Sequence, residues 1–164
     1  MEPAIEVQLA SGHSDEPTVE QVCNWVGAAL AVFQDAGASL TVRMVDETEM
    51  IELNTRFRAR PGSTNVLSFP VEALPGLPEA EHPLGDIVVC PSVVEREALS
   101  QGKKVEDHFA HLVVHGVLHL HGHDHQSDSQ AAAMEQLETD VLATLGIKNP
   151  YQTVCYCRKK QKKT

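Results

Sequence analysis

Five of the nine histidines lie in one stretch, HGVLHLHGHDH, which begins at His115. His115 and His119 are four residues apart on an expected helix, so their side chains share a face. Gly122 can take the left-handed conformation that ends a helix, and His125 can then return to the same side. Three imidazoles on one face leave a fourth coordination position open, as in catalytic zinc sites. The spacing therefore predicts a metal site with His115, His119 and His125 as ligands.

The other histidines of this region leave alternatives open. His111 lies four residues before the first histidine of the motif, so that pair could supply two ligands instead. Because His125 can return to the side of His115 and His119, that pair is favoured. His108 and His111 are expected to be packed or solvated side chains, and the alternative is that they line the approach to the site. His121 and His123 are expected to be solvated or to donate a hydrogen bond near a ligand. Without a metal, the stretch would be a histidine-rich surface turn.

The residue after the first ligand is Gly116. Peptidases with the pattern H-E-x-x-H-x-x-G-x-x-H carry glutamate there as general base. A metal-bound water ionises near neutral pH without that base, so hydrolysis remains possible whereas peptide cleavage by the usual route does not. One zinc ion is expected because zinc suits three imidazoles, and nickel, copper or iron would also accept nitrogen ligands. An anionic substrate such as a phosphodiester fits this chemistry.

The chain is acidic as a whole, whereas its C-terminus is basic. Its formal net charge is −10, yet the last seven residues, RKKQKKT, hold five of its 13 basic side chains. An acidic body is not the general footprint of a nucleic-acid binder. Residues 152–164 are expected to be a disordered basic tail, and the alternative is an arm that binds phosphates. Cys155 and Cys157 could join a metal but are expected to be bystanders.

Length and composition predict one domain over residues 1–151. No stretch approaches the roughly 18 apolar residues of a membrane span, and the N-terminus lacks a secretory pattern. The four cysteines are scattered, which favours reduced thiols in the cytoplasm.

Hydrophobic periodicity predicts an α+β or mixed α/β domain, with a small sheet and about five helices. Gly37 is expected to end the first helix. Strands are expected near 5–9, 40–44, 64–70 and 85–90, and helices near 18–33, 47–57, 91–101, 105–121 and 128–145.

The histidine motif resembles the signature H-G-x-L-H-L-x-G-x-D-H of the bacterial YbeY-type endoribonucleases. The resemblance extends over most of the chain, from about residue 5 to 151, in the same order. It includes LNTRFR at 53–58, TNVLSFP at 64–70, LGDIVVC at 84–90 and MEQLETDVLATLG at 134–146.

This resemblance implies an α+β, zincin-like fold with a small mixed sheet beside the metal helix. It implies a metal-dependent, single-strand-specific endoribonuclease in ribosomal RNA maturation and ribosome quality control. The implied partners are single-stranded RNA, ribosomal RNA, and the ribosome or proteins of its small subunit, with no membrane. The family's metal ligands fall on His115, His119 and His125, and its functional arginine falls on Arg58. A guanidinium suits this role because it binds a phosphate through two N–H groups.

A second hypothesis is a non-catalytic, ribosome-associated factor whose metal is structural and whose Arg58 only grips RNA. The open fourth coordination position favours the enzyme. Hydrolysis of a small ester or a peptide is a third alternative.

Overall fold

The computed structural model describes residues 3–35, 37–71, 83–124 and 126–151. The strands are β1 (Ala4–Leu9), β2 (Ser39–Met44), β3 (Val66–Pro70) and β4 (Pro83–Val89). The helices are α1 (Val19–Val32), α2 (Glu47–Arg58), α3 (Pro91–Gln101), α4 (Val105–Leu120) and α5 (Asp128–Thr144). Strands and helices alternate up to β3, after which β4 and then three consecutive helices follow.

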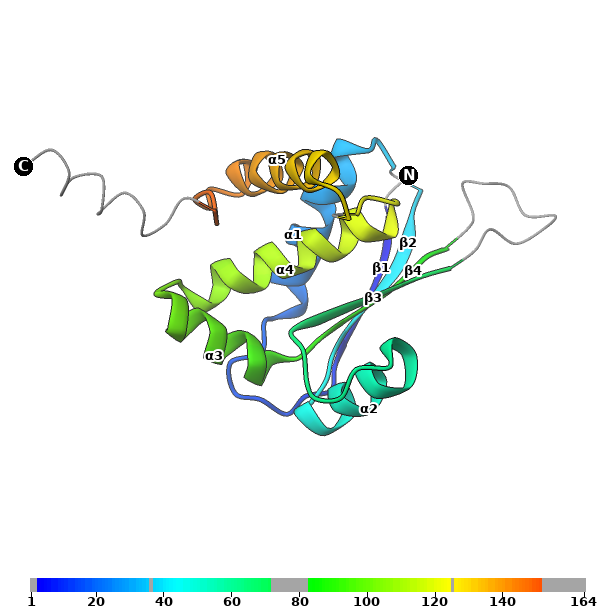
Figure 1. The fold of residues 1–164 in the computed structure, drawn as a ribbon. Coiled ribbons are helices and arrows are strands. Elements are labelled where there is room, and N and C mark those ends of the chain that lie inside the picture. The colour runs from blue at the N-terminus through cyan, green and yellow to red at the C-terminus, as the bar shows by residue number, and fades with distance from the viewer. Residues whose placement is uncertain (1–2, 36, 72–82, 125, 152–164) are drawn as a thin grey trace, which may run out of the picture.

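The four strands form one mixed sheet in the order β1-β2-β4-β3. β1, β2 and β4 are parallel, and β3 pairs antiparallel with β4 at the edge. Figure 1 shows α1, α4 and α5 on one side of the sheet and α2 on the other. The antiparallel edge strand lies beside α4, and this arrangement brings β3 next to the histidines of that helix.

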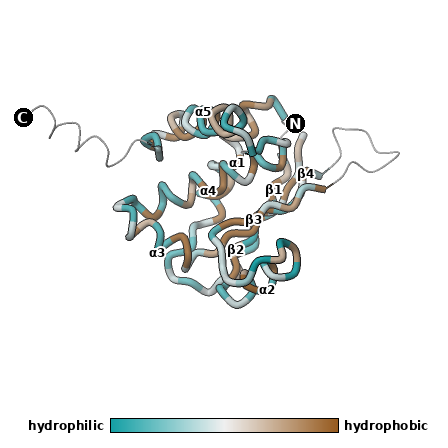
Figure 2. Tube along the Cα trace, in the orientation of Figure 1, coloured by the Kyte–Doolittle hydropathy of each residue, from teal (hydrophilic) through white to brown (hydrophobic). Residues whose placement is uncertain are grey.

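Helix α4 is the central element of the fold. Ten of its 16 residues are buried, and it contacts α1, α3, α5, β3 and β4. Its apolar residues join the main core between the sheet and the helices, whereas a second, smaller cluster fills the space between the sheet and α2. In Figure 2 the middle of the sheet is mostly hydrophobic and the outer turns of α2 and α3 are mostly hydrophilic. A helix held on so many sides is a rigid support for metal ligands.

The α+β class, the small mixed sheet and the five helices are confirmed. The expected end of the first helix was wrong. α1 ends at Val32, and Gln34, with φ of 53°, takes the left-handed conformation in place of Gly37. None of the described helices is long and apolar enough to cross a bilayer. The predicted basic tail, Cys155 and Cys157 lie outside the described residues.

Candidate metal centre and its groove

An open groove of about 950 Å³ lies where the end of α4, the end of α2 and the edge strand β3 meet. Its lining brings together the sequence-predicted residues Arg58, His115 and His119. Asp124 is the one carboxylate among the described residues that line it, against two arginines, in a chain of net charge −10. The groove also includes Asn54, Arg60, Pro61, Ser63, Thr64, Asn65, Val66, Leu67, Ser68, Pro70, Gly122, His123 and Gln126.

His115 and His119 direct their Nε2 atoms at one point, 3.0 Å apart. Two nitrogens bound tetrahedrally to one zinc ion at 2.0–2.1 Å would be about 3.3 Å apart. Nδ1 of His115 donates a hydrogen bond to Glu138, which leaves the lone pair of the neutral ring on Nε2. This is the tautomer in which His115 can bind a metal, and the spacing of the two Nε2 atoms is close to that of two ligands of one ion.

Glu138 of α5 is a functional candidate that sequence reasoning missed. Its side chain is fully buried, and one oxygen accepts the bond from His115 while the other is bound by His111 Nε2 at 3.1 Å and by the Tyr151 hydroxyl. Burial raises the pKa of this carboxyl, but the bonds from His111 and His115 outweigh it and bring the pKa to about 2. Glu138 is therefore ionised and holds the His115 ring in place.

His111 is not placed as a ligand partner of His115. Its Nε2 faces Glu138 and Tyr151, at 3.1 Å from each, rather than the point shared by His115 and His119. The pair inside the motif is thus the one whose nitrogens converge. The buried carboxylate of Glu138, on the neighbouring helix, determines where His111 points. The spacing of histidines along α4 could not predict this contact.

The third predicted ligand, His125, lies outside the described residues. Gly122 has φ of 92°, which ends α4 with the left-handed turn that the sequence predicted. α5 then begins after Ser127, whose side chain and that of Gln130 form a capping box. The turn between these two helices is therefore short, and its residues on either side of position 125 line the groove.

Arg58 lies in the last turn of α2 and reaches the rim of the groove. Its Nη2 donates to the carbonyl oxygen of Ser68 on β3. Asn65 directs its carbonyl at β4, where Cys90 N–H binds it at 2.9 Å, so alternation along the strand turns the Ser68 carbonyl away from β4. Arg58 is thus tied to the outer edge of the sheet, and a guanidinium has further N–H donors for an anion.

The loop after Arg58 is held by Asn54. Its side chain is buried and donates through Nδ2 to the Gly62 carbonyl at 3.0 Å, and its backbone carbonyl accepts from Arg60 N–H at 3.3 Å. Ala59 takes a left-handed conformation, with φ of 53°, where the helix ends. The ARPGS loop is therefore fastened at two points beside the groove.

Gly116 occupies the peptidase-glutamate position for a steric reason. It is buried against β4, and a Cβ built on it would lie 2.9 Å from Cγ2 of Ile87. Ile87 itself is fully buried and belongs to the main core. A glycine inside a helix costs up to about 1 kcal/mol, and here it permits α4 to approach the sheet closely. A glutamate at this position has no room.

The leading expectation for His108 was confirmed, whereas that for His121 was wrong. His108 is a packed side chain that does not line the groove: it is 4% exposed, and its Nε2 is 2.9 Å from a carboxylate oxygen of Glu97. His121 is not a solvated side chain, since it stacks on Phe33 at 3.9 Å and bonds Asp35 at 3.1 Å. Both rings are structural contacts of α4.

A second cluster of metal-binding groups lies away from the groove. His13, Asp15 and Glu95 each place one ligand atom within 4.8 Å of the others, so together they could hold a metal ion. Nδ1 of His13 already accepts Asp15 N–H at 3.1 Å, which leaves the ring proton on Nε2. That proton must leave before Nε2 can bind a metal. The hydrogen bond with Asp15 raises the pKa of Glu95.

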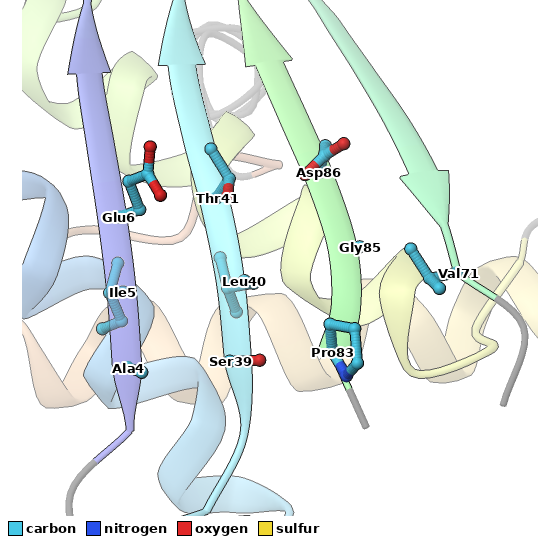
Figure 3. Close-up of a pocket in the computed structure, with 10 residues that line it drawn as sticks. All are labelled: Ala4, Ile5, Glu6, Ser39, Leu40, Thr41, Val71, Pro83, Gly85 and Asp86. Carbon is cyan, nitrogen blue, oxygen red and sulfur yellow. The ribbon is translucent and has the colours of Figure 1, made fainter. Parts of the chain in front are cut away.

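Another depression, of about 550 Å³, lies on the sheet face opposite the main core. Glu6, Thr41 and Asp86 are paired in register on β1, β2 and β4, and Figure 3 shows their side chains along it. Two carboxylates in one row repel a phosphate. This face does not suit an anionic substrate.

The comparisons with known proteins concern nearly the whole chain. The family model described as endoribonuclease YbeY matches residues 6–146. A protein of Alkalilimnicola ehrlichii is 57% identical over 78% of both chains, and one of Halorhodospira halophila is 49% identical over 90% of this chain and 97% of its own. An Idiomarina loihiensis protein is 47% identical over 91% of both chains. All three carry the name endoribonuclease YbeY.

The fold has a counterpart among solved structures. A Thermotoga maritima protein determined in solution matches with a TM-score of 0.54 and 24% identity, over 89% of this chain and 99% of its own. At that identity the likeness concerns the fold. The family model and the three relatives, at 47–57% identity, also show the family. The residues 6–146 that the family model matches include those that line the groove. This chain belongs to the endoribonuclease YbeY family.

Proposed function

We infer that this protein is an endoribonuclease, a hydrolase of RNA phosphodiester bonds, and that it acts through a metal ion held by His115, His119 and His125. The observation that carries this proposal is the convergence of the His115 and His119 Nε2 atoms, 3.0 Å apart, in the same groove as Arg58. Its family relatives carry the name of this activity.

Arg58 is the residue proposed to bind the scissile phosphate. Its exposed position at the groove rim lets an RNA backbone approach, and its bond to the Ser68 carbonyl fixes the direction of the guanidinium. A planar guanidinium binds two phosphate oxygens at once and offsets charge that grows in the transition state. Arg60 adds a second positive charge on the same side.

The imidazoles supply the other half of the site. Glu138 holds His115 with its lone pair toward the groove, and the packed helix α4 fixes the spacing of His115 and His119. When bound, a divalent ion such as zinc acts as a Lewis acid and lowers the pKa of water. Gly116 leaves the site without the glutamate base of peptidases, which favours a phosphodiester over a peptide.

Zinc is the proposed metal because imidazole nitrogens suit it, and nickel, copper and iron share that preference. We place the catalytic ion at α4 rather than at His13, Asp15 and Glu95, since Arg58 lies at the groove of α4. The proposed substrate is single-stranded RNA, with ribosomal RNA and the ribosome or its small-subunit proteins as physiological partners in the cytoplasm. Two segments that resemble the family, LNTRFR and TNVLSFP, form the rim of the groove, and they support this proposal of substrate and partners.

The alternative is a ribosome-associated factor without catalysis. A direct assay separates the two: purified protein is incubated with defined single-stranded and double-stranded RNAs, with and without chelator. We expect metal-dependent cleavage of the single strand, and loss of both metal and cleavage in His119→Ala. End-group analysis distinguishes attack by water, which can leave a 5′-phosphate, from attack by the 2′-hydroxyl, which leaves a cyclic phosphate. If wild type and His119→Ala leave all the RNA intact while the wild type holds its metal, the non-catalytic factor is the correct reading.

A further inference from the structure

Two aromatic rings continue the groove rim beyond Arg58. The guanidinium carbon of Arg58 lies 5.4 Å from the ring centroid of Phe69. Phe57 then meets Phe69 edge to face, with centroids 5.5 Å apart and an angle of 72° between the rings. Arg58, Phe69 and Phe57 are therefore consecutive neighbours.

Phe57 is exposed to an extent that packing does not explain. It is 56% exposed, although it is a large apolar side chain on a helix whose buried residues are Met50 and Asn54. Phe69 packs on the cluster under the sheet and gives the outer ring a fixed support. Contact with a second ring restricts the motion of the exposed ring, and a side chain that is already restricted loses less entropy on binding.

The surroundings of Phe57 are cationic. The guanidinium carbon of Arg56 lies 5.9 Å from the Phe57 centroid, and Arg58 and Arg60 follow on the same segment. In a chain of net charge −10 this is a local reversal of sign. Aromatic rings interleaved with arginines are the combination that binds the bases and backbone of single-stranded nucleic acid.

We propose that Phe57 is a stacking platform for an unpaired RNA base adjacent to the phosphate that Arg58 holds. This proposal rests on the proposed function, because it places the base relative to the scissile phosphate. Stacking on a side chain requires a base whose face is free, and a base inside a duplex has neighbours on both faces. The platform thereby favours single strands, and it tolerates any sequence since every base has a π-face.

The test uses tryptophan fluorescence in the presence of chelator, so that binding is read without cleavage. The chain has one tryptophan, Trp25, which is buried and 7% exposed. Phe57→Trp therefore adds a reporter at the platform itself. Oligouridylate should quench this fluorescence, whereas the same backbone with abasic sites, or a duplex with oligoadenylate, should quench it much less.

A second measurement compares affinities for oligouridylate by fluorescence anisotropy. Phe57→Ala should weaken binding roughly 5-fold to 100-fold, the range for one base–aromatic stack, and Phe57→Trp should restore it. Ile51→Ala is the matched control, because Ile51 lies on the same helix and is 41% exposed; its affinity should equal that of the wild type.

The outcomes separate this inference from the proposed function. If Phe57→Ala binds like the wild type, or if abasic and normal strands quench Phe57→Trp equally, the platform is refuted even where the protein cleaves RNA. If both readouts change as expected but no RNA is cut, the platform stands and the endoribonuclease proposal fails. An equal loss of affinity in Phe57→Ala and Ile51→Ala would trace the effect to the helix and also refute the platform.

Discussion

Glu138 and His115 form a hydrogen bond between helices α5 and α4 inside the fold. The carboxylate is fully buried, and among the described residues the side chains of His115, His111 and Tyr151 bind it. A carboxylate behind a ligand imidazole fixes the ring and makes its outer nitrogen more basic. The metal site is therefore coupled to the packing of α5 as well as to the sequence of α4.

Glu138→Gln should weaken metal binding about 10-fold to 100-fold, the usual effect of losing such a partner. The amide keeps the size of the side chain but removes the negative charge that favours the bound imidazole. Competition with a chromophoric chelator measures the affinity, and circular dichroism checks the fold. Glu135→Gln is the control, because Glu135 is exposed on the same helix. An unchanged affinity in Glu138→Gln would assign this carboxylate to packing alone.

Arg58→Ala should reduce turnover of single-stranded RNA by about 100-fold or more, the scale for one lost electrostatic stabiliser. Metal content should stay normal, because the Arg58 side chain binds Ser68 and none of the histidines in the described structure. Arg58→Lys should recover only part of the activity, since an ammonium lacks the two-pronged geometry. Cleavage by Arg58→Ala at the wild-type rate would remove this residue from the mechanism.

Gly116→Glu should lower the stability of the folded protein rather than create the general base of a peptidase. The first carbon of the new side chain would meet Ile87 at 2.9 Å, and its carboxylate would be buried without a partner. Overpacking and an uncompensated buried charge each cost on the order of 1–3 kcal/mol or more. Thermal unfolding of the two proteins measures the loss. A variant as stable as the wild type would show that α4 can move away from the sheet.

Periodicity was sufficient to predict the order and type of the elements, because each strand and helix buries apolar residues against one of the two hydrophobic clusters. The exception, Gly37, failed for a local reason: Gln34 takes the left-handed turn three residues earlier. Helix spacing also predicted that His115 and His119 converge, since residues four apart share a face wherever the helix lies.

The partners from other elements could not be predicted in this way. Glu138 reaches His115 only because α5 packs on α4, and the sequence holds no spacing rule for that contact. The contacts of His108 and His121 depend similarly on Glu97 of α3 and on Phe33, which lie on other segments of the chain. Gly116 was visible as a departure from the peptidase pattern, but its steric cause required the position of Ile87.

Glu47 links three segments around the outer wall of the groove. Its carboxylate accepts hydrogen bonds from Arg96 at 2.9 and 3.0 Å and from Ser63 at 3.0 Å. These contacts, with that of Arg96 the largest, lower the pKa of Glu47 from 4.5 to about 2. Ser63 belongs to the loop after α2 and lines the groove. Its hydrogen bond to Glu47 therefore holds this side of the groove in place.

Glu47→Gln should lower the free energy of unfolding in a pH-dependent way. The folded pKa is depressed, so the stabilisation is complete above the ordinary pKa of 4.5 and is lost as pH falls toward 2. The side chain is 38% exposed, and solvent screening limits the effect to about 1 kcal/mol or less. Urea denaturation of both proteins at several pH values measures the difference, which should be largest at neutral pH and shrink between 4.5 and 2. Glu20→Gln, which changes an exposed carboxylate in the first turn of α1, is the control for removing one surface charge. A difference between wild type and Glu47→Gln that stays constant over this range would assign the loss to packing rather than to the charge of Glu47.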